Sequence, residues 1–235
     1  MSDFLWYPIK DLPFIFLVLM IAFTLHEFAH AYSAYKFGDR TAYDAGRVTL
    51  NPRAHLDVMG TILLLVAGFG WARPVPVNRS RFKYPRLMGI VVSAVGPLSN
   101  LLLTAIGILA VYVLNQTGLL QAGSFGVHSA IVHFLNYLIT LNVMLFIFNL
   151  IPVPPLDGYR IIQDLAPTPL RIRMDQYETW GMFLFLLIVF VPPLRAATLD
   201  PLFANSDSII SCIMQICELF FDKVDWAQFV ADFYR

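Results

Sequence analysis

The chain is poor in charged residues and in cysteine. Lysine, arginine, aspartate and glutamate together make up 14% of its 235 residues, well below the roughly 25% of soluble domains. The formal net charge is +0, so nothing indicates nucleic-acid binding. The two cysteines, Cys212 and Cys217, are too few for a disulfide framework or a four-thiolate zinc site. The remainder is 58% hydrophobic with a mean hydropathy of +0.66, which predicts a multi-spanning membrane protein.

Four long apolar segments account for this composition. They cover about residues 13–37, 87–114, 128–151 and 177–192, and each is near or above the length that crosses roughly 30 Å of hydrocarbon. The first is too long for a signal peptide and lacks a basic n-region, so we expect a permanent span. We predict an all-α polytopic membrane protein with four long transmembrane helices. We also predict two shorter elements, a re-entrant or short β-like segment at 60–72 and a further C-terminal helix at 205–221.

The basic residues are unevenly distributed among the connections. They are concentrated in 38–86 and recur in 152–176, whereas 115–127 carries no charge. The positive-inside rule therefore places the first two segments on the cytoplasmic side of the inner membrane and the third outside. This topology requires 60–72 to enter the membrane and return on the same side, which is allowed where protein or water lines the segment.

The first apolar segment ends in TLHEFAHAYS, which contains His26, Glu27 and His30. On a helix, residues i and i+4 share one face, so both imidazoles can reach one metal ion. Glu27 projects beside them and is suited to take a proton from a water molecule. The alternative is a pair of histidines satisfied by neighbouring helices. Titratable groups inside a span are costly unless they are paired or metal-bound, so we predict a metal site.

A third ligand is expected because a catalytic zinc site usually has three protein ligands and one open position. The stretch FNLIPVPPLDGYR at 148–160 ends the third long span, and its prolines prevent a regular helix beyond Asn149. Asp157 follows in unwound chain, and the topology predicted from charge brings it to the same side as the histidines. Its alternative role is a loop aspartate that caps a turn.

Together, HEFAH and NLIPVPPLDG resemble the signature motifs of the site-2 protease family of intramembrane zinc metalloproteases. The family has HExxH on one span and NxxPxPxLDG on a later one, and this chain matches both. The stretches GPLSN (96–100), GRVTLNPRAHLDVMGT (46–61) and PVPVN (74–78) resemble further parts of its compact prokaryotic branch. No PDZ or CBS domain, present in some relatives, is expected.

The resemblance implies a ligand set and a reaction. It implies zinc on His26, His30 and Asp157, with Glu27 as the general base and Asn149 near the substrate or the oxyanion. The implied substrate is a single-span membrane protein, cut within or near its transmembrane segment in the lipid bilayer. Two histidines and a carboxylate also suit zinc better than other divalent ions.

The whole chain, 1–235, is predicted to form one membrane-embedded protease domain. Its catalytic core covers about 14–165, and C-terminal helices cover 177–235. The active site is expected to lie toward the cytoplasmic side.

Several other polar residues have a structural and a functional interpretation. His55 is either a substrate-side or metal-supporting group or a solvated loop histidine. Asn100 either bonds neighbouring helices or lies near the zinc. His128 and His133, on the outer side, are expected to be structural. The stretches GRVTL and RPVPV favour short edge strands, which could hold a substrate in extended form. The alternative is an interfacial hairpin with no role at the substrate.

The motifs leave three alternative functions open. A metal transporter with the same ligands would need polar residues across the bilayer, yet 115–127 is uncharged and the first span is apolar up to Thr24. A catalytically silent pseudoprotease that binds membrane helices would typically lack Glu27 or a ligand. A metalloprotease with a glutamate as third ligand would need Glu178 or Glu218, and neither lies in a suitable helix motif.

Overall fold

Helices are the only regular elements in the part of the chain that the computed structural model describes, residues 7–67, 70–119 and 124–233. Within these ranges three helical segments are long and apolar enough to cross a membrane, namely Ile9–Lys36, Pro85–Gln116 and Phe125–Asn149. A fourth candidate joins Thr168–Phe190 to Pro192–Cys217 with a bend of 91°. The predicted all-α polytopic membrane fold is confirmed.

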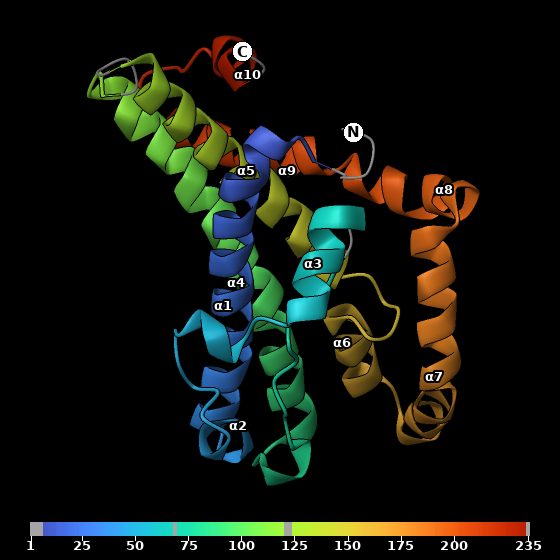
Figure 1. The fold of residues 1–235 in the computed structure, drawn as a ribbon. Helices are drawn as coiled ribbons and strands as arrows, with labels where there is room; N and C mark the ends of the chain where they lie inside the picture. The colour runs from blue at the N-terminus through green and yellow to red at the C-terminus, as the bar shows by residue number, and fades with distance from the viewer. Residues whose placement is uncertain (1–6, 68–69, 120–123, 234–235) are drawn as a thin grey trace.

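The three spans form a bundle of α1 (Leu12–Lys36), α4 (Pro85–Gln116) and α5 (Phe125–Asn149), which Figure 1 shows side by side. The short 3-10 helix η1 (Ile9–Asp11) leads into α1, and a proline lies in the first turn of both α1 and α4, where its missing N–H costs nothing. α1 ends just before Gly38, whose φ of 99° is the left-handed value that glycine adopts most readily. In the half of the bundle nearer the N-terminus, the helices bury an apolar core that includes Ile15, Val18, Ile108, Val111 and Val132.

The connection from α1 to α4 contains α2 (Thr41–Asp44), the 3-10 helices η2 (Pro52–Ala54) and η3 (Arg79–Arg81), and α3 (Val58–Ala67). The backbone N–H of Arg73 donates to the carbonyl oxygen of His55 at 2.8 Å, so the segment that departs after His55 returns beside it. A Cβ on Gly60 would lie 2.1 Å from the carbonyl oxygen of Trp71, which shows how closely the two arms pack. The two described ends of this segment therefore lie together, as the predicted topology requires. Residues 68–69 lie outside the described part of the chain, and entry of 60–72 into the membrane stays a prediction.

The edge strands predicted in GRVTL and RPVPV are wrong, because both stretches are irregular in the described residues. Pro74 and Pro76 have no N–H to donate to a strand ladder. The side chain of Arg47 takes the place of a neighbouring strand, since it donates to the carbonyl oxygens of Arg73 at 2.5 Å and Pro74 at 3.2 Å.

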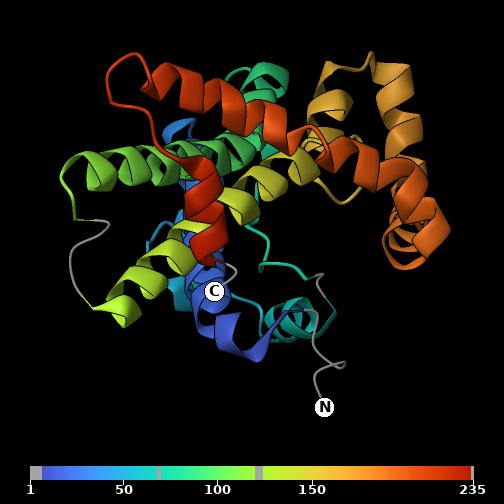
Figure 2. The same ribbon diagram turned by 90° about the horizontal axis from the view of Figure 1, so that it is seen from above.

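The C-terminal half of the chain begins beside the bundle and ends across it. α6 (Asp157–Leu165) packs on α4, and α7 (Thr168–Phe190) covers 177–190 of the predicted fourth span, which is long and apolar enough only together with its bent continuation. α8 (Pro192–Phe203) and α9 (Ser206–Cys217) then run across the end of the bundle where α1 begins, and α10 (Trp226–Phe233) packs on α5 (Figures 1 and 2). The helix predicted at 205–221 therefore forms, but it crosses the bundle and does not run parallel to it.

Candidate metal centre

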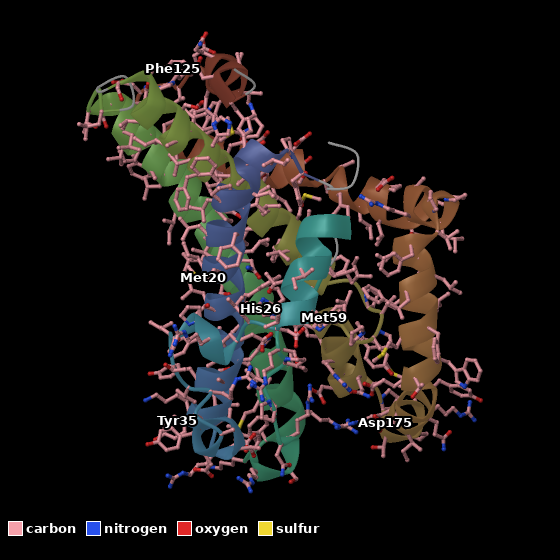
Figure 3. All side chains as sticks on the ribbon, in the orientation of Figure 1. Met20, His26, Tyr35, Met59, Phe125 and Asp175 are labelled. Carbon is pink, nitrogen blue, oxygen red and sulfur yellow. The ribbon has the colours of Figure 1, made fainter. Side chains whose placement is uncertain are left out.

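His26, which Figure 3 labels, lies one turn before His30 on α1, and both imidazoles approach Asp157, the first residue of α6. Oδ2 of Asp157 lies 3.1 Å from Nε2 of His26 and 3.3 Å from Nε2 of His30, and the two Nε2 atoms are 3.0 Å apart. Zinc bonds of about 2.0–2.1 Å at tetrahedral angles separate ligand atoms by about 3.3 Å. The triangle therefore has the size that one zinc ion requires. No other group in the described residues brings three such ligands together.

The end of α5 and the turn after it place Asp157. A Cβ on Gly158 would lie 2.2 Å from the carbonyl oxygen of Leu150, so only glycine lets α6 begin against the end of α5. Asp157 thereby lies in the first turn of α6, where the helix dipole favours a negative charge.

Both imidazoles are oriented by groups on α4. Nδ1 of His30 lies 2.6 Å from the carbonyl oxygen of Val92, and Nδ1 of His26 lies 2.8 Å from Oδ1 of Asn100. Each acceptor requires the proton on Nδ1, which leaves the Nε2 lone pair for a metal ion. Asn100 is therefore at the site. Val92 was missed by sequence reasoning, because a backbone carbonyl has no signature in the side-chain pattern.

Gly96 on α4 provides the space that the two rings occupy. A Cβ at this position would lie 2.3 Å from Nε2 of His30 and 2.8 Å from Cε1 of His26. Real Cβ contacts are not that short, so any larger residue would displace the imidazoles. Gly96 of the GPLSN stretch thus leaves room for the two imidazoles, and Asn100 of the same stretch provides a hydrogen-bond acceptor.

Glu27 lies beside the ligands in the same cavity, which has a volume of about 660 Å³. Its side chain is buried, and Oε2 accepts a hydrogen bond of 2.9 Å from the backbone N–H of Val75. The extended segment after α3 therefore holds one carboxylate oxygen in place. A carboxylate and three candidate ligands therefore line one cavity.

The other predicted site residues lie at different distances from this centre. Asn149, the last residue of α5, lines the cavity, and its Nδ2 donates to the carbonyl oxygen of Leu145 at 3.0 Å. His55 is 0% exposed, so its interpretation as a solvated loop histidine is wrong. Its Nε2 donates to the carbonyl oxygen of Thr49 at 2.7 Å, and burial lowers the pKa of the imidazole. His55 supports the loop that carries Val75, and a direct role at the substrate stays a prediction.

The two glutamates considered as alternative ligands have other partners. Glu178, on the wall of the cavity, forms an ion pair of 2.5 Å with Arg160. Glu218 lies near the C-terminal end of α9, where Oε1 accepts from the hydroxyl of Tyr112 at 3.4 Å. Neither glutamate belongs to a group that could hold a metal ion within the described residues.

Comparisons with known proteins agree with this geometry. Residues 14–191 match the family model of peptidase family M50. YwhC of Bacillus subtilis, whose name describes it as a predicted zinc metalloprotease, is 50% identical over 217 residues, which cover 92% of this chain and 98% of that protein. Rip2 of Mycolicibacterium smegmatis, described in the same way, is 29% identical over 181 residues, or 75% of this chain and 66% of that protein. No solved structure shows a significant match.

Proposed function

We infer that the chain, which belongs to peptidase family M50 and has several membrane-spanning helices, is a membrane metalloprotease. We propose that it cleaves single-span membrane proteins within or near their transmembrane segments. The observation that carries this proposal is the triangle of His26, His30 and Asp157 beside Glu27. Two of these ligands lie on a helix that is long and apolar enough to span the bilayer. A site at that depth meets a peptide bond that lies within or close to a membrane segment.

The residues at the site fit zinc in number, chemistry and spacing. His26 and His30 would bind it through Nε2, and Asp157 through Oδ2. When bound, zinc supplies a Lewis acid that lowers the pKa of water and polarises a carbonyl group. The names of YwhC and Rip2 describe zinc enzymes, which supports zinc over other divalent ions.

Glu27 is the proposed general base. It takes a proton from the attacking water, whose oxygen forms the new bond to the peptide carbonyl carbon. The bond between that carbon and nitrogen then breaks, and Glu27 gives the proton to the leaving amine. The hydrogen bond from Val75 holds Oε2 during this exchange and leaves the other oxygen for the proton transfer. Asn149 is proposed to contact the substrate, because it lies on the wall of the same cavity.

The distribution of charge supports a site on the cytoplasmic side of the inner membrane. The cavity is lined by Arg79 and Arg160, from the arginine-containing segments 38–86 and 152–176. Basic connections stay in the cytoplasm. Water is expected to reach the site from that side.

Cleavage by the purified full chain in lipid vesicles tests the proposal. A single-span model substrate is incubated with wild type, Glu27→Gln and the matched control Glu218→Gln, and bound zinc is measured in each. We expect Glu27→Gln to keep its zinc and lose cleavage by about 100-fold or more, the usual contribution of a general base. Glu218→Gln should cleave like wild type. Equal cleavage by Glu27→Gln would refute the assignment, and zinc-loaded wild type that cuts nothing would favour a pseudoprotease.

A further inference from the structure

Two buried asparagines connect the backbone of α5 to His26. Asn142 on α5 and Asn100 on α4 are both 0% exposed. Nδ2 of Asn142 donates to the carbonyl oxygen of Leu138 at 2.8 Å, and its Oδ1 accepts from Nδ2 of Asn100 at 3.0 Å. Oδ1 of Asn100 then lies 2.8 Å from Nδ1 of His26. The chain of hydrogen bonds is therefore continuous from a main-chain carbonyl to a candidate ligand.

The direction of every bond in this chain follows from its first member. The carbonyl oxygen of Leu138 can only accept, so Asn142 must turn its NH₂ group toward it. The oxygen of Asn142 must then face Asn100, so Asn100 has to donate from its own NH₂ group. The oxygen of Asn100 is left for His26, and an acceptor at Nδ1 requires the proton there. Nε2 of His26 consequently keeps a free lone pair.

We propose that Asn142 is a positioning residue of the metal site, and that it sets the tautomer of His26 through Asn100. This inference rests on the proposed function, because it assumes that Nε2 of His26 binds zinc. Without Asn142, the amide of Asn100 is free to rotate by half a turn and present NH₂ to His26. The imidazole would then carry its proton on Nε2, where a proton and a metal ion exclude one another.

The neighbouring histidine shows why only one of the two needs such a chain. His30 meets the carbonyl oxygen of Val92 directly, and a carbonyl has a single orientation. Asn100 is an amide that can face either way, so its orientation has to be set by another group. The competing explanation is that Asn142 only bonds α4 to α5, as asparagines between membrane helices often do.

Zinc affinity of four variants distinguishes these explanations. The dissociation constant is measured by competition with a chromophoric chelator on purified full chain in detergent. We expect Asn142→Leu to weaken binding by about 10- to 100-fold, as loss of an outer hydrogen-bond partner does in other zinc sites. Asn142→Asp should bind like wild type. A buried carboxyl takes its neutral form, donates to Leu138 and still offers an oxygen to Asn100.

The Asn100→Asp background provides the decisive control. Because the adjacent imidazole and metal ion favour its ionised form, a carboxylate at position 100 offers an oxygen to His26 in either orientation, so nothing remains for Asn142 to set. Asn142→Leu should therefore cost little affinity when it is combined with Asn100→Asp. An equal loss in both backgrounds would show that Asn142 acts by packing and would overturn the inference, as would unchanged zinc affinity in the single variant.

Two further results keep the test decisive. If Asn142→Leu does not fold, ¹⁵N-histidine NMR of the zinc-free wild type is the alternative, and a proton on Nε2 of His26 would overturn the inference. If wild type binds no zinc, the proposed function fails together with the inference. Zinc-bound wild type with an unaffected Asn142→Leu variant would refute the inference alone.

Discussion

Two clusters of histidine and aspartate lie along α1, one at its N-terminal start and one in its C-terminal half. The inner cluster contains His26, His30 and Asp157. In the outer cluster, Oδ1 of Asp11 lies 3.4 Å from Nε2 of His133, and Oδ2 accepts from the hydroxyl of Tyr137 at 3.1 Å. Asp11 precedes His26 by fifteen residues, or about 22 Å along a helix at 1.5 Å per residue.

The two clusters differ in what surrounds the histidine–aspartate contact. The outer cluster has one imidazole, whose Nδ1 donates to the carbonyl oxygen of Ser129 at 2.8 Å, and the rings of Phe14 and Phe233 pack on it. The inner cluster adds a second imidazole one helical turn away and opens into a cavity. A buried histidine beside an aspartate is therefore not enough to indicate a metal site. The second ligand and the open space make the difference.

Removal of a carboxylate from each cluster should give the largest contrast. We expect Asp157→Asn to weaken zinc binding by more than about 100-fold, since the loss of an outer contact alone costs about 10- to 100-fold. Asp11→Asn should leave zinc binding unchanged and lower only the stability of the fold. Chelator competition measures both, and zinc binding that survives in Asp157→Asn would assign the ion to other residues.

A pair of glycine substitutions on α4 should separate the space for the imidazoles from packing elsewhere. In Gly96→Ala the new Cβ would meet Nε2 of His30 at 2.3 Å, so we expect a loss of zinc affinity of about tenfold or more, comparable to other disturbed ligand geometries. In Gly107→Ala the new Cβ would meet Cγ1 of Ile139 at 2.8 Å. That change should cost about 1–3 kcal/mol of stability by overpacking and leave zinc affinity intact. Similar zinc affinities in the two variants would contradict the close approach of α4.

Most of the inner cluster could be predicted from the sequence, because its members are identified by the chemistry of their side chains. His26, Glu27 and His30 follow from helical spacing, and Asp157 follows from the proline-rich break after α5. The features that were not predicted depend on backbone groups or on how two helices pack together. The acceptor for His30 is the carbonyl of Val92, and the need for glycine at position 96 arises only when α4 approaches α1.

Irregular segments were harder to predict than spans. The β-branched residues around Val75 indicated an edge strand, yet the arginine side chain at position 47 bonds this segment in place of a second strand. The distribution of charge predicts that 60–72 returns to the side that it leaves, and the bond between Arg73 and His55 brings the two ends of this segment together. The sequence pattern did not single out Asn142, since one polar residue in an apolar span has many explanations.

Loosening the segment that holds Glu27 should affect turnover without affecting the metal. Arg47→Met removes the bonds to the carbonyl oxygens of residues 73 and 74, which precede the Val75 N–H. We expect cleavage to fall by about tenfold, because misplacement of a catalytic group by a fraction of an ångström is costly, with zinc content unchanged. The control is Arg53→Met, an exposed arginine in the same connection. Equal rates in both variants would show that the segment does not position Glu27.

The smallest effect is expected in the outer cluster. Tyr137→Phe removes the hydroxyl that donates to Asp11, and an incompletely satisfied buried acceptor costs about 1–3 kcal/mol. We expect a lower temperature of thermal unfolding in detergent, with unchanged zinc content and unchanged cleavage. A loss of cleavage without a loss of stability would mean that the two ends of the bundle are coupled.

X-ray absorption spectroscopy of the zinc-loaded full chain tests the central claim most directly. The ligands His26, His30 and Asp157 predict a four-coordinate ion with nitrogen and oxygen at about 2.0–2.2 Å and the multiple-scattering signal of two imidazoles. The same spectrum should be absent from Asp157→Asn at equal zinc concentration and present in Asp11→Asn. A sulfur ligand at about 2.3 Å would instead place the ion on the cysteines near the C-terminus. That result would contradict the assignment of the inner cluster as the metal centre.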